Sequence, residues 1–192
     1  MERNRLEAFS DGVLAIVITI MVLEIKTPHG TDWEAIRPLV GKLLSYVLSF
    51  AYIGIYWNNH HHLLQTVRQV SGGILWANLH LLFWLTLIPV ANGWLSENGV
   101  ARAPAVAYGT VLFCAAVAYK LLQEAILRSH GEDSVLARAL GSDLKGKLSI
   151  YLYLVGVILA FWQPWLAIAA YAGVAVMWLV PDRRIERELA QG

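Results

Sequence analysis

Long apolar runs separated by short polar stretches make up nearly the whole chain. They predict helices over residues of about 6–25, 39–64, 74–95, 103–127, 146–162 and 164–180. A helix of about 20 mostly apolar residues is long enough to cross a bilayer. The last two runs are short and separated only by Gln163-Pro164, which predicts a tight helical hairpin. We therefore expect an all-α integral membrane protein with six transmembrane helices, forming one domain over residues 1–192.

Composition supports a membrane protein. Hydrophobic residues make up 57% of the 192 positions and charged residues only 15%, and the mean hydropathy is +0.52. These values lie outside the range of soluble globular domains. The formal net charge of +1 gives no reason to expect a nucleic-acid partner. Membrane lipid is the expected surrounding.

The distribution of lysine and arginine predicts the orientation, because these residues gather in the cytoplasmic loops. With the N-terminus inside, the inner segments hold ten basic residues: Arg3, Arg5, Arg68, Arg128, Arg138, Lys145, Lys147, Arg183, Arg184 and Arg187. The outer segments hold Lys26, Arg37 and Arg102, with Lys42 near the outer end of the second helix. We therefore expect a multi-pass protein of the cell membrane with both termini in the cytoplasm.

The longest inner connection runs from Ser129 to Lys147 and is charged and punctuated by glycine. Part of it, from Ser134 to Leu140, is expected to form a short interfacial helix. Lys120 lies near the inner end of the fourth predicted helix, where its long side chain reaches the membrane surface. Glu124 follows one turn later and is its expected ion partner.

Polar residues stand at the entrance of the first predicted helix. Arg5, Phe9, Ser10 and Asp11 come directly before the apolar residues 13–23. An ionisable group inside the bilayer costs roughly 2.5–3.5 kcal/mol on insertion scales, so it normally faces protein or water and has a function. Asp11 is therefore the first candidate functional residue.

An aliphatic stripe follows on the same helix. Ile16, Ile20 and Leu23 have i, i+4, i+7 spacing and share one face, with Thr19 adjacent to its middle. Such a stripe is most often ordinary packing, so these residues alone leave its role open.

The second predicted helix ends in Trp57, two asparagines and the three histidines 60–62. Consecutive helical residues point about 100° apart, so the three histidines cannot hold one metal ion. We expect no metal site here, and instead a histidine facing the carboxylate of Asp11, which needs hydrogen bonds or a counter-charge. His61, His62 and His80 remain without an assigned role.

Three motifs together resemble the transmembrane protein 175 family of potassium channels, in its prokaryotic six-helix branch. The first motif runs from Arg5 through Phe9-Ser10-Asp11 to Ile20, and the others are Trp57-x-x-His60-His61 and Leu75-x-x-Asn78-Leu79. The resemblance implies a homotetramer whose pore is lined by the first helix of each subunit. It also implies that Ile16, Ile20 and Leu23 form the constriction, with Thr19 beside it. One departure is Leu14, where the family commonly has phenylalanine.

By the same resemblance, His60 and Asn78 form a polar network with Ser10 and Asp11 at the cytoplasmic end, next to Trp57. Arg5, one turn before Phe9, is a further expected partner for the carboxylate.

The expected function is passive, modestly potassium-selective cation conduction, with potassium as the permeant ion and no cofactor. No TVGYG-type segment is present to form a carbonyl filter, so any potassium preference must come from another device, and the aliphatic constriction that the resemblance implies is the natural alternative. The alternative is a proton- or cation-coupled transporter that uses Asp11 and His60 as a relay. An enzyme is not expected, because no nucleophile or metal cluster has supporting acid–base partners.

Overall fold

The computed structural model describes residues 2–131, 134–140 and 143–179. Arg183, Arg184 and Arg187, which entered the orientation argument, lie outside this part. The described residues form helices and contain no strand. The elements are α1 (Arg3–Leu23), the short 3-10 helix η1 (Trp33–Leu39), α2 (Val40–Gln65), α3 (Gly72–Thr86), α4 (Ile88–Glu97), α5 (Arg102–His130), α6 (Val135–Leu140), α7 (Leu144–Ala160) and α8 (Pro164–Leu179).

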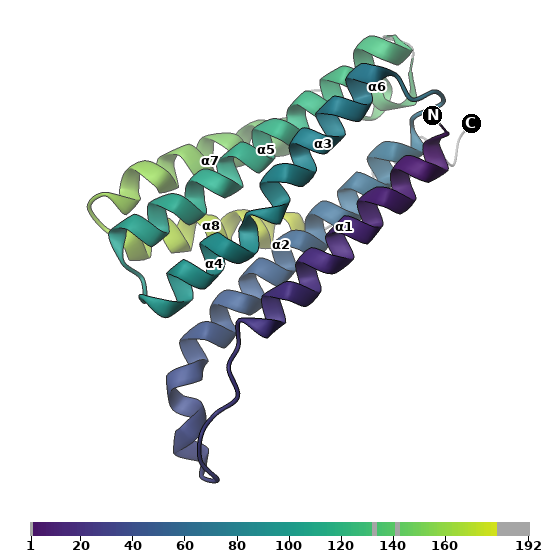
Figure 1. Ribbon diagram of the computed structural model, residues 1–192. Coiled ribbons are helices and arrows are strands. Elements are labelled where there is room, and N and C mark those ends of the chain that lie inside the picture. The colour runs from purple at the N-terminus through teal and green to yellow at the C-terminus, as the bar shows by residue number, and fades with distance from the viewer. Residues whose placement is uncertain (1, 132–133, 141–142, 180–192) are drawn as a thin grey trace.

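The helices form one elongated bundle (Figure 1). The pore-lining candidate α1 packs against α2, α3 and α4, and α5 packs between α3 and α7. The hairpin of α7 and α8 completes the bundle on the side away from α1 (Figure 1). The start of α1 lies at the same end as α6, while the loop from α1 to η1 projects from the opposite end (Figure 1).

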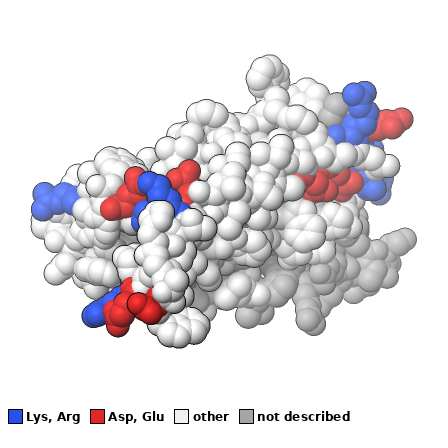
Figure 2. Space-filling model, turned by 60° about the horizontal axis from the view of Figure 1, so that its bottom comes forward, with Lys and Arg blue, Asp and Glu red and all other residues white. Residues whose placement is uncertain are grey.

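Among the described residues, four segments are long and apolar enough to cross a membrane: Arg3–Leu23, Trp33–Gln65, Gly72–Glu97 and Arg102–His130. They correspond to the first four predicted spans. The predicted fifth and sixth spans are α7 and α8, with 17 and 16 residues. Their length, about 24–26 Å at 1.5 Å per residue, is shorter than the usual hydrocarbon thickness. One face of the bundle carries its charged side chains toward the two ends, with an uncharged band between them (Figure 2).

The third predicted span is interrupted. It consists of α3 and α4, separated at Leu87, and Pro89 lies in the first turn of α4, where its missing amide proton does no harm. Beside this break, polar side chains join α4 to α2. The Oδ1 atom of Asn92 accepts hydrogen bonds from Ser45 and Ser49 at 2.5 and 2.9 Å. These contacts hold α4 against α2.

The inner connection also differs from one expectation. The short helix α6 lies where the interfacial helix was predicted, and the Ser134 hydroxyl accepts a hydrogen bond from the amide of Ala137. The expected pair of Lys120 with Glu124 was wrong. Lys120 Nζ lies 3.2 Å from Asp143 Oδ2, and Glu124 pairs with Arg128 at 3.5 Å. The carboxylate of Asp143 is buried and needs a counter-charge more than that of Glu124, which is partly solvated.

The buried ring of Tyr171 on α8 organises the helices of the second half. Its hydroxyl donates to the carbonyl of Ala105 on α5, and its own carbonyl accepts from the Tyr52 hydroxyl on α2. The ring fits only because α5 and α7 carry glycines opposite it. A Cβ atom on Gly109 would lie 1.8 Å from the Tyr171 hydroxyl, and one on Gly156 would lie 2.4 Å from the ring.

Alanine at Gly156 should therefore destabilise the protein. Overpacking of this kind costs about 1–3 kcal/mol, because the ring must leave its position between α5 and α7. The matched control is Gly173→Ala on α8, where a Cβ atom meets nothing within 4 Å. Thermal unfolding of the purified protein should show a lower midpoint for Gly156→Ala and an unchanged or higher one for the control. Equal midpoints for both variants would contradict this packing.

Candidate pore helix and polar network

The two faces of α1 have different surroundings. One face packs into the bundle through Leu6, Leu14, Val17 and Met21, none of them more than 2% exposed. The other face carries the aliphatic stripe, with Ile16 59%, Ile20 44% and Leu23 77% exposed.

Thr19 lies on the same outward face as the stripe. Its hydroxyl donates to the carbonyl of Ile16 at 2.9 Å, as serine and threonine hydroxyls often do within helices. The hydroxyl oxygen keeps acceptor capacity toward whatever lies outside α1. All four predicted constriction residues are therefore on one surface that the described part of the chain leaves exposed.

A buried chain of hydrogen bonds joins the first three long helices at the end where α1 begins. The Nδ2 atom of Asn78 on α3 donates to Ser10 Oγ on α1 at 3.0 Å. Asn78 Oδ1 lies 2.6 Å from His60 Nε2 on α2. Because the amide oxygen is an acceptor, His60 donates from Nε2. The three side chains are at most 1% exposed, so water does not reach them. Within this polar network they therefore serve as hydrogen-bond partners for one another.

Asp11 makes a separate contact. Its Oδ1 atom accepts a hydrogen bond from Trp57 Nε1 at 3.0 Å, and both residues are exposed on the chain. No hydrogen bond between Asp11 and His60 occurs among the described residues. In place of the expected direct contact, Asp11 bonds to Trp57 and His60 bonds to Asn78. The physical reason is helical rotation. Asp11 points about 100° away from Ser10, which occupies the buried face.

The arginine contacts also differ from the expected pairing of Arg5 with Asp11. Arg5 and Phe9 are exposed, and no ion pair within the described chain joins Arg5 to Asp11. Arg3 lies nearer the bundle, with its Nε atom 3.8 Å from Glu7, and it donates to the carbonyl of Gln65 at 3.3 Å. Sequence reasoning missed this pair, although its i, i+4 spacing is a usual signal.

Two of the three histidines without an expected role, the half-buried His61 and the exposed His80, have local partners. His61 lies 2.9 Å from the Gln65 amide and stacks near Trp57, with ring centroids 6.4 Å apart. His80 Nε2 accepts from Trp84 Nε1 at 2.9 Å. Within the described ranges, no group of three or more histidine, cysteine or acidic side chains is placed to hold a metal ion.

Comparison with known proteins identifies the family of this fold. A family profile described as endosomal/lysosomal potassium channel TMEM175 matches residues 5–89, which contain the stripe and the polar network. A protein of Chryseobacterium sp. (strain P1-3), named as a potassium channel, is 51% identical over all of this chain and all of its own length. The chain belongs to the TMEM175 family of ion channels.

A solved structure and a vertebrate relative agree with this assignment. The crystal structure of a lysosomal potassium-selective channel TMEM175 homolog from Chamaesiphon minutus matches with a TM-score of 0.77 at 28% identity. The match covers 94% of this chain and 98% of that one. The human endosomal/lysosomal proton channel TMEM175 is 32% identical over 54% of this chain, which spans 23% of the human protein. The chain is therefore an all-helical, multi-pass membrane protein of a channel family.

The polar network generates a stability prediction. Asn78→Leu keeps the branching and the number of side-chain heavy atoms but removes the partner of buried His60 and the donor to Ser10. The expected cost is about 1–3 kcal/mol. Asp11→Asn alters only an exposed contact and should cost less than about 1 kcal/mol. The thermal midpoint of the purified protein should therefore fall clearly for Asn78→Leu and little for Asp11→Asn. A larger fall for Asp11→Asn would show that the carboxylate is the main stabilising group.

Proposed function

We propose that the protein is a passive cation channel that prefers potassium, with a pore lined by α1 from each subunit of a homotetramer. The observation that carries this proposal is the outward stripe of Ile16, Ile20 and Leu23 on the helix that bears the family motif. A second supporting fact is that Asp11, about 140° around α1 from Ile16, is also exposed on the single chain, and a carboxylate is costly against lipid. An axis shared by several subunits gives both groups a protein or water environment.

The stripe is proposed as the constriction, with Thr19 beside it. Rings of aliphatic side chains control conduction by dewetting, and ions pass only after losing part of their hydration. Sodium holds its water more tightly than potassium, so partial dehydration at a narrow apolar ring favours potassium. The preference should be modest, because no ring of carbonyl oxygens replaces the lost water.

Potassium is proposed in preference to protons as the main permeant ion. The relative that matches along its whole length is named as a potassium channel. The vertebrate relatives named as proton channels share only part of their length with this chain, 23% in the human case.

The alternative of a proton- or cation-coupled transporter has less support. A relay through Asp11 and His60 needs the two groups to exchange a proton directly or through one intermediary. In the described structure, Asp11 is bonded to Trp57 and His60 is bonded to Asn78. The network is instead proposed to hold α1 against α2 and α3 at the cytoplasmic end of the pore.

Ile16→Asn tests the constriction. Asparagine has the same number of side-chain heavy atoms as isoleucine but is smaller, and it adds an amide that hydrates an apolar ring and contacts a partly dehydrated cation. Potassium conductance should therefore rise. The potassium-to-sodium permeability ratio should fall several-fold, so the reversal potential between potassium on one side and sodium on the other should move toward zero. The measurement uses purified protein in planar bilayers or liposomes under a set potential.

Val22→Asn is the matched control for that experiment. Val22 is also an exposed aliphatic residue of α1, 46% exposed, but points about 120° away from Ile16. It should leave the reversal potential unchanged. An unchanged reversal potential and conductance in well-assembled Ile16→Asn protein would remove Ile16 from the pore and favour a different conduction path.

Six crossings with both termini in the cytoplasm are proposed from the basic residues, and cysteine labelling tests the orientation of α1 that this requires. In a Cys114→Ser background, single cysteines replace Glu2 and Asp32, which lie at opposite ends of α1. An impermeant maleimide added to intact cells should label position 32 and spare position 2 until the cells are broken. The reverse pattern would invert the proposed orientation of the pore.

A further inference from the structure

Phe9 lies on the same face of α1 as the proposed constriction. Phe9, Ile16 and Leu23 follow one another at intervals of seven residues within one continuous helix, and each interval turns a side chain by only about 20° around it. All three are exposed on the single chain, Phe9 by 52%, Ile16 by 59% and Leu23 by 77%. Any arrangement of copies that turns Ile16 toward a shared axis therefore turns Phe9 in the same direction.

The surroundings of Phe9 in its own chain do not explain this position. The polar network beside it is made by Ser10, whose buried side chain points about 100° away from that of Phe9. Tryptophan and tyrosine rings anchor helices at membrane surfaces through their polar groups. Phenylalanine has no such group. A large apolar ring therefore faces outward at the entrance of α1, where only an environment beyond the single chain can use it.

Between Phe9 and Ile16 this face carries a glycine. Gly12 is exposed and lies about 40° around α1 from Ile16. Glycine inside a helix costs about 1 kcal/mol relative to alanine, yet a Cβ atom on Gly12 would meet nothing within 4 Å in the described chain. Packing within the chain therefore does not require glycine here. What glycine provides on this face is space, together with access of water to the helix backbone.

We propose that Phe9 forms a second, inner ring of the pore, and that Gly12 leaves a wider, water-filled level between this ring and the ring of Ile16. The inference rests on the proposed function, a pore lined by α1 of four copies. The two rings lie about 10 Å apart along α1, so an ion regains water between them. Rings of apolar side chains control conduction by dewetting, and Phe9 acts in this way as an inner gate. Selectivity stays with Ile16, Ile20 and Leu23, where successive apolar layers follow without a wide level.

The charge of Arg5 does not close this entrance. Arg5 is exposed and lies one turn before Phe9 on the same side of α1. It stands in the first turn of the helix, so its long side chain reaches out to the cytoplasmic water. Phe9 is therefore the first apolar side chain that an ion from the cytoplasm meets on this face.

Phe9→Ala widens the inner ring and separates gating from selectivity. Purified protein in planar bilayers should show a potassium conductance several-fold higher than that of the unchanged chain. The reversal potential between potassium on one side and sodium on the other should stay the same, because the aliphatic stripe is intact. Phe9→Leu keeps a large apolar side chain and should change the conductance less than Phe9→Ala does.

Chemical modification tests whether position 9 faces the conduction path. In a Cys114→Ser background, Phe9→Cys is treated from the cytoplasmic side with a positively or a negatively charged methanethiosulfonate reagent. The positive group should lower the potassium current several-fold, because the added charges repel cations from the path, and the negative group should lower it much less. The matched control is Asn4→Cys, which is also exposed but lies about 140° around α1 from Phe9. Either reagent should leave its current nearly unchanged.

Gly12→Val tests the wider level. The added side chain should lower the potassium conductance several-fold, while native mass spectrometry still shows the same oligomer as for the unchanged chain. An unchanged conductance would overturn the wider level. Loss of the oligomer would overturn it as well, because Gly12 would then serve close contact between copies.

The outcomes separate the inner ring from the pore itself. If Ile16→Asn shifts the reversal potential while Phe9→Ala and modified Phe9→Cys conduct as before, α1 lines the pore but Phe9 forms no gate. If none of these changes affects conduction, the proposed pore fails too. Loss of the oligomer in Phe9→Ala and Phe9→Leu would assign Phe9 to a contact between copies and overturn the inner ring.

Discussion

The fold around the proposed pore depends on one requirement, that polar side chains buried among apolar helices must be hydrogen-bonded. Asn78 meets this requirement for two other residues at once, because its amide donates to Ser10 and accepts from His60. The three residues come from α1, α2 and α3. Their contacts fix the rotation of α1 about its own axis, and this rotation turns Ile16 and the rest of its stripe outward.

Apolar contacts alone would specify this rotation poorly. Lipid is as apolar as leucine, so helices in a membrane gain little orientation from hydrophobic burial and depend more on close packing and on polar contacts between helices. The chain uses both devices. Asn92 holds α4 to α2 beside the break at Leu87, and Tyr171 fits between α5 and α7 only where Gly109 and Gly156 leave room.

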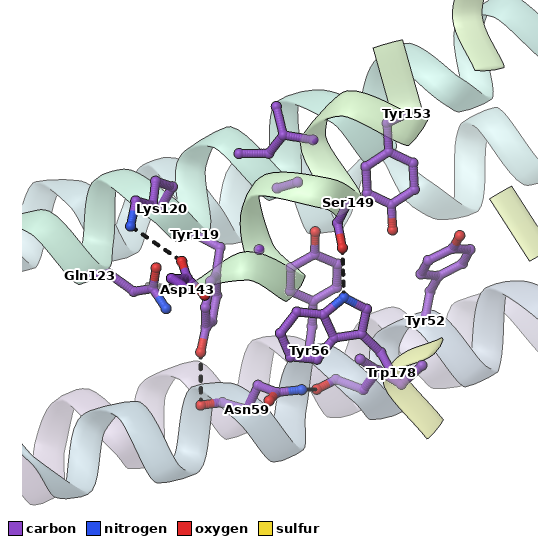
Figure 3. A pocket seen from close by; sticks show the side chains of 14 residues that line it. Tyr52, Tyr56, Asn59, Tyr119, Lys120, Gln123, Asp143, Ser149, Tyr153 and Trp178 are labelled. Carbon is purple, nitrogen blue, oxygen red and sulfur yellow. Dashed lines mark hydrogen bonds and ion pairs between the residues drawn. The ribbon is translucent and has the colours of Figure 1, made fainter. Parts of the chain in front are cut away.

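The second half of the bundle follows the same reasoning. Lys120 and Asp143 neutralise each other where α5 meets the start of α7, and Trp178 Nε1 donates to Ser149 Oγ. Beside them lies a cavity of about 60 Å³ lined by residues of α2, α5, α7 and α8 (Figure 3). Because α2 borders both this space and α1, the cavity and the proposed pore share one structural element.

Some features of the site follow directly from the order of residues. The lengths of the apolar runs predict the four segments that are long and apolar enough to cross a membrane in the described chain, since hydrophobic length is a property of sequence alone. The i, i+4, i+7 spacing likewise predicts that Ile16, Ile20 and Leu23 share a face. The break between α3 and α4 is harder to predict, because Pro89 is compatible with either a kinked helix or two helices.

The partners of the charged and polar groups could be decided only by tertiary structure. Asp11 was expected to meet His60, and Lys120 to meet Glu124, because these groups lie at the same depth or one turn apart. The structure instead pairs Asp11 with Trp57 and Lys120 with Asp143. Sequence determines how far along a helix a side chain lies and which neighbours share its face. The rotation of that helix against the others, about 100° for each residue, determines what the side chain touches.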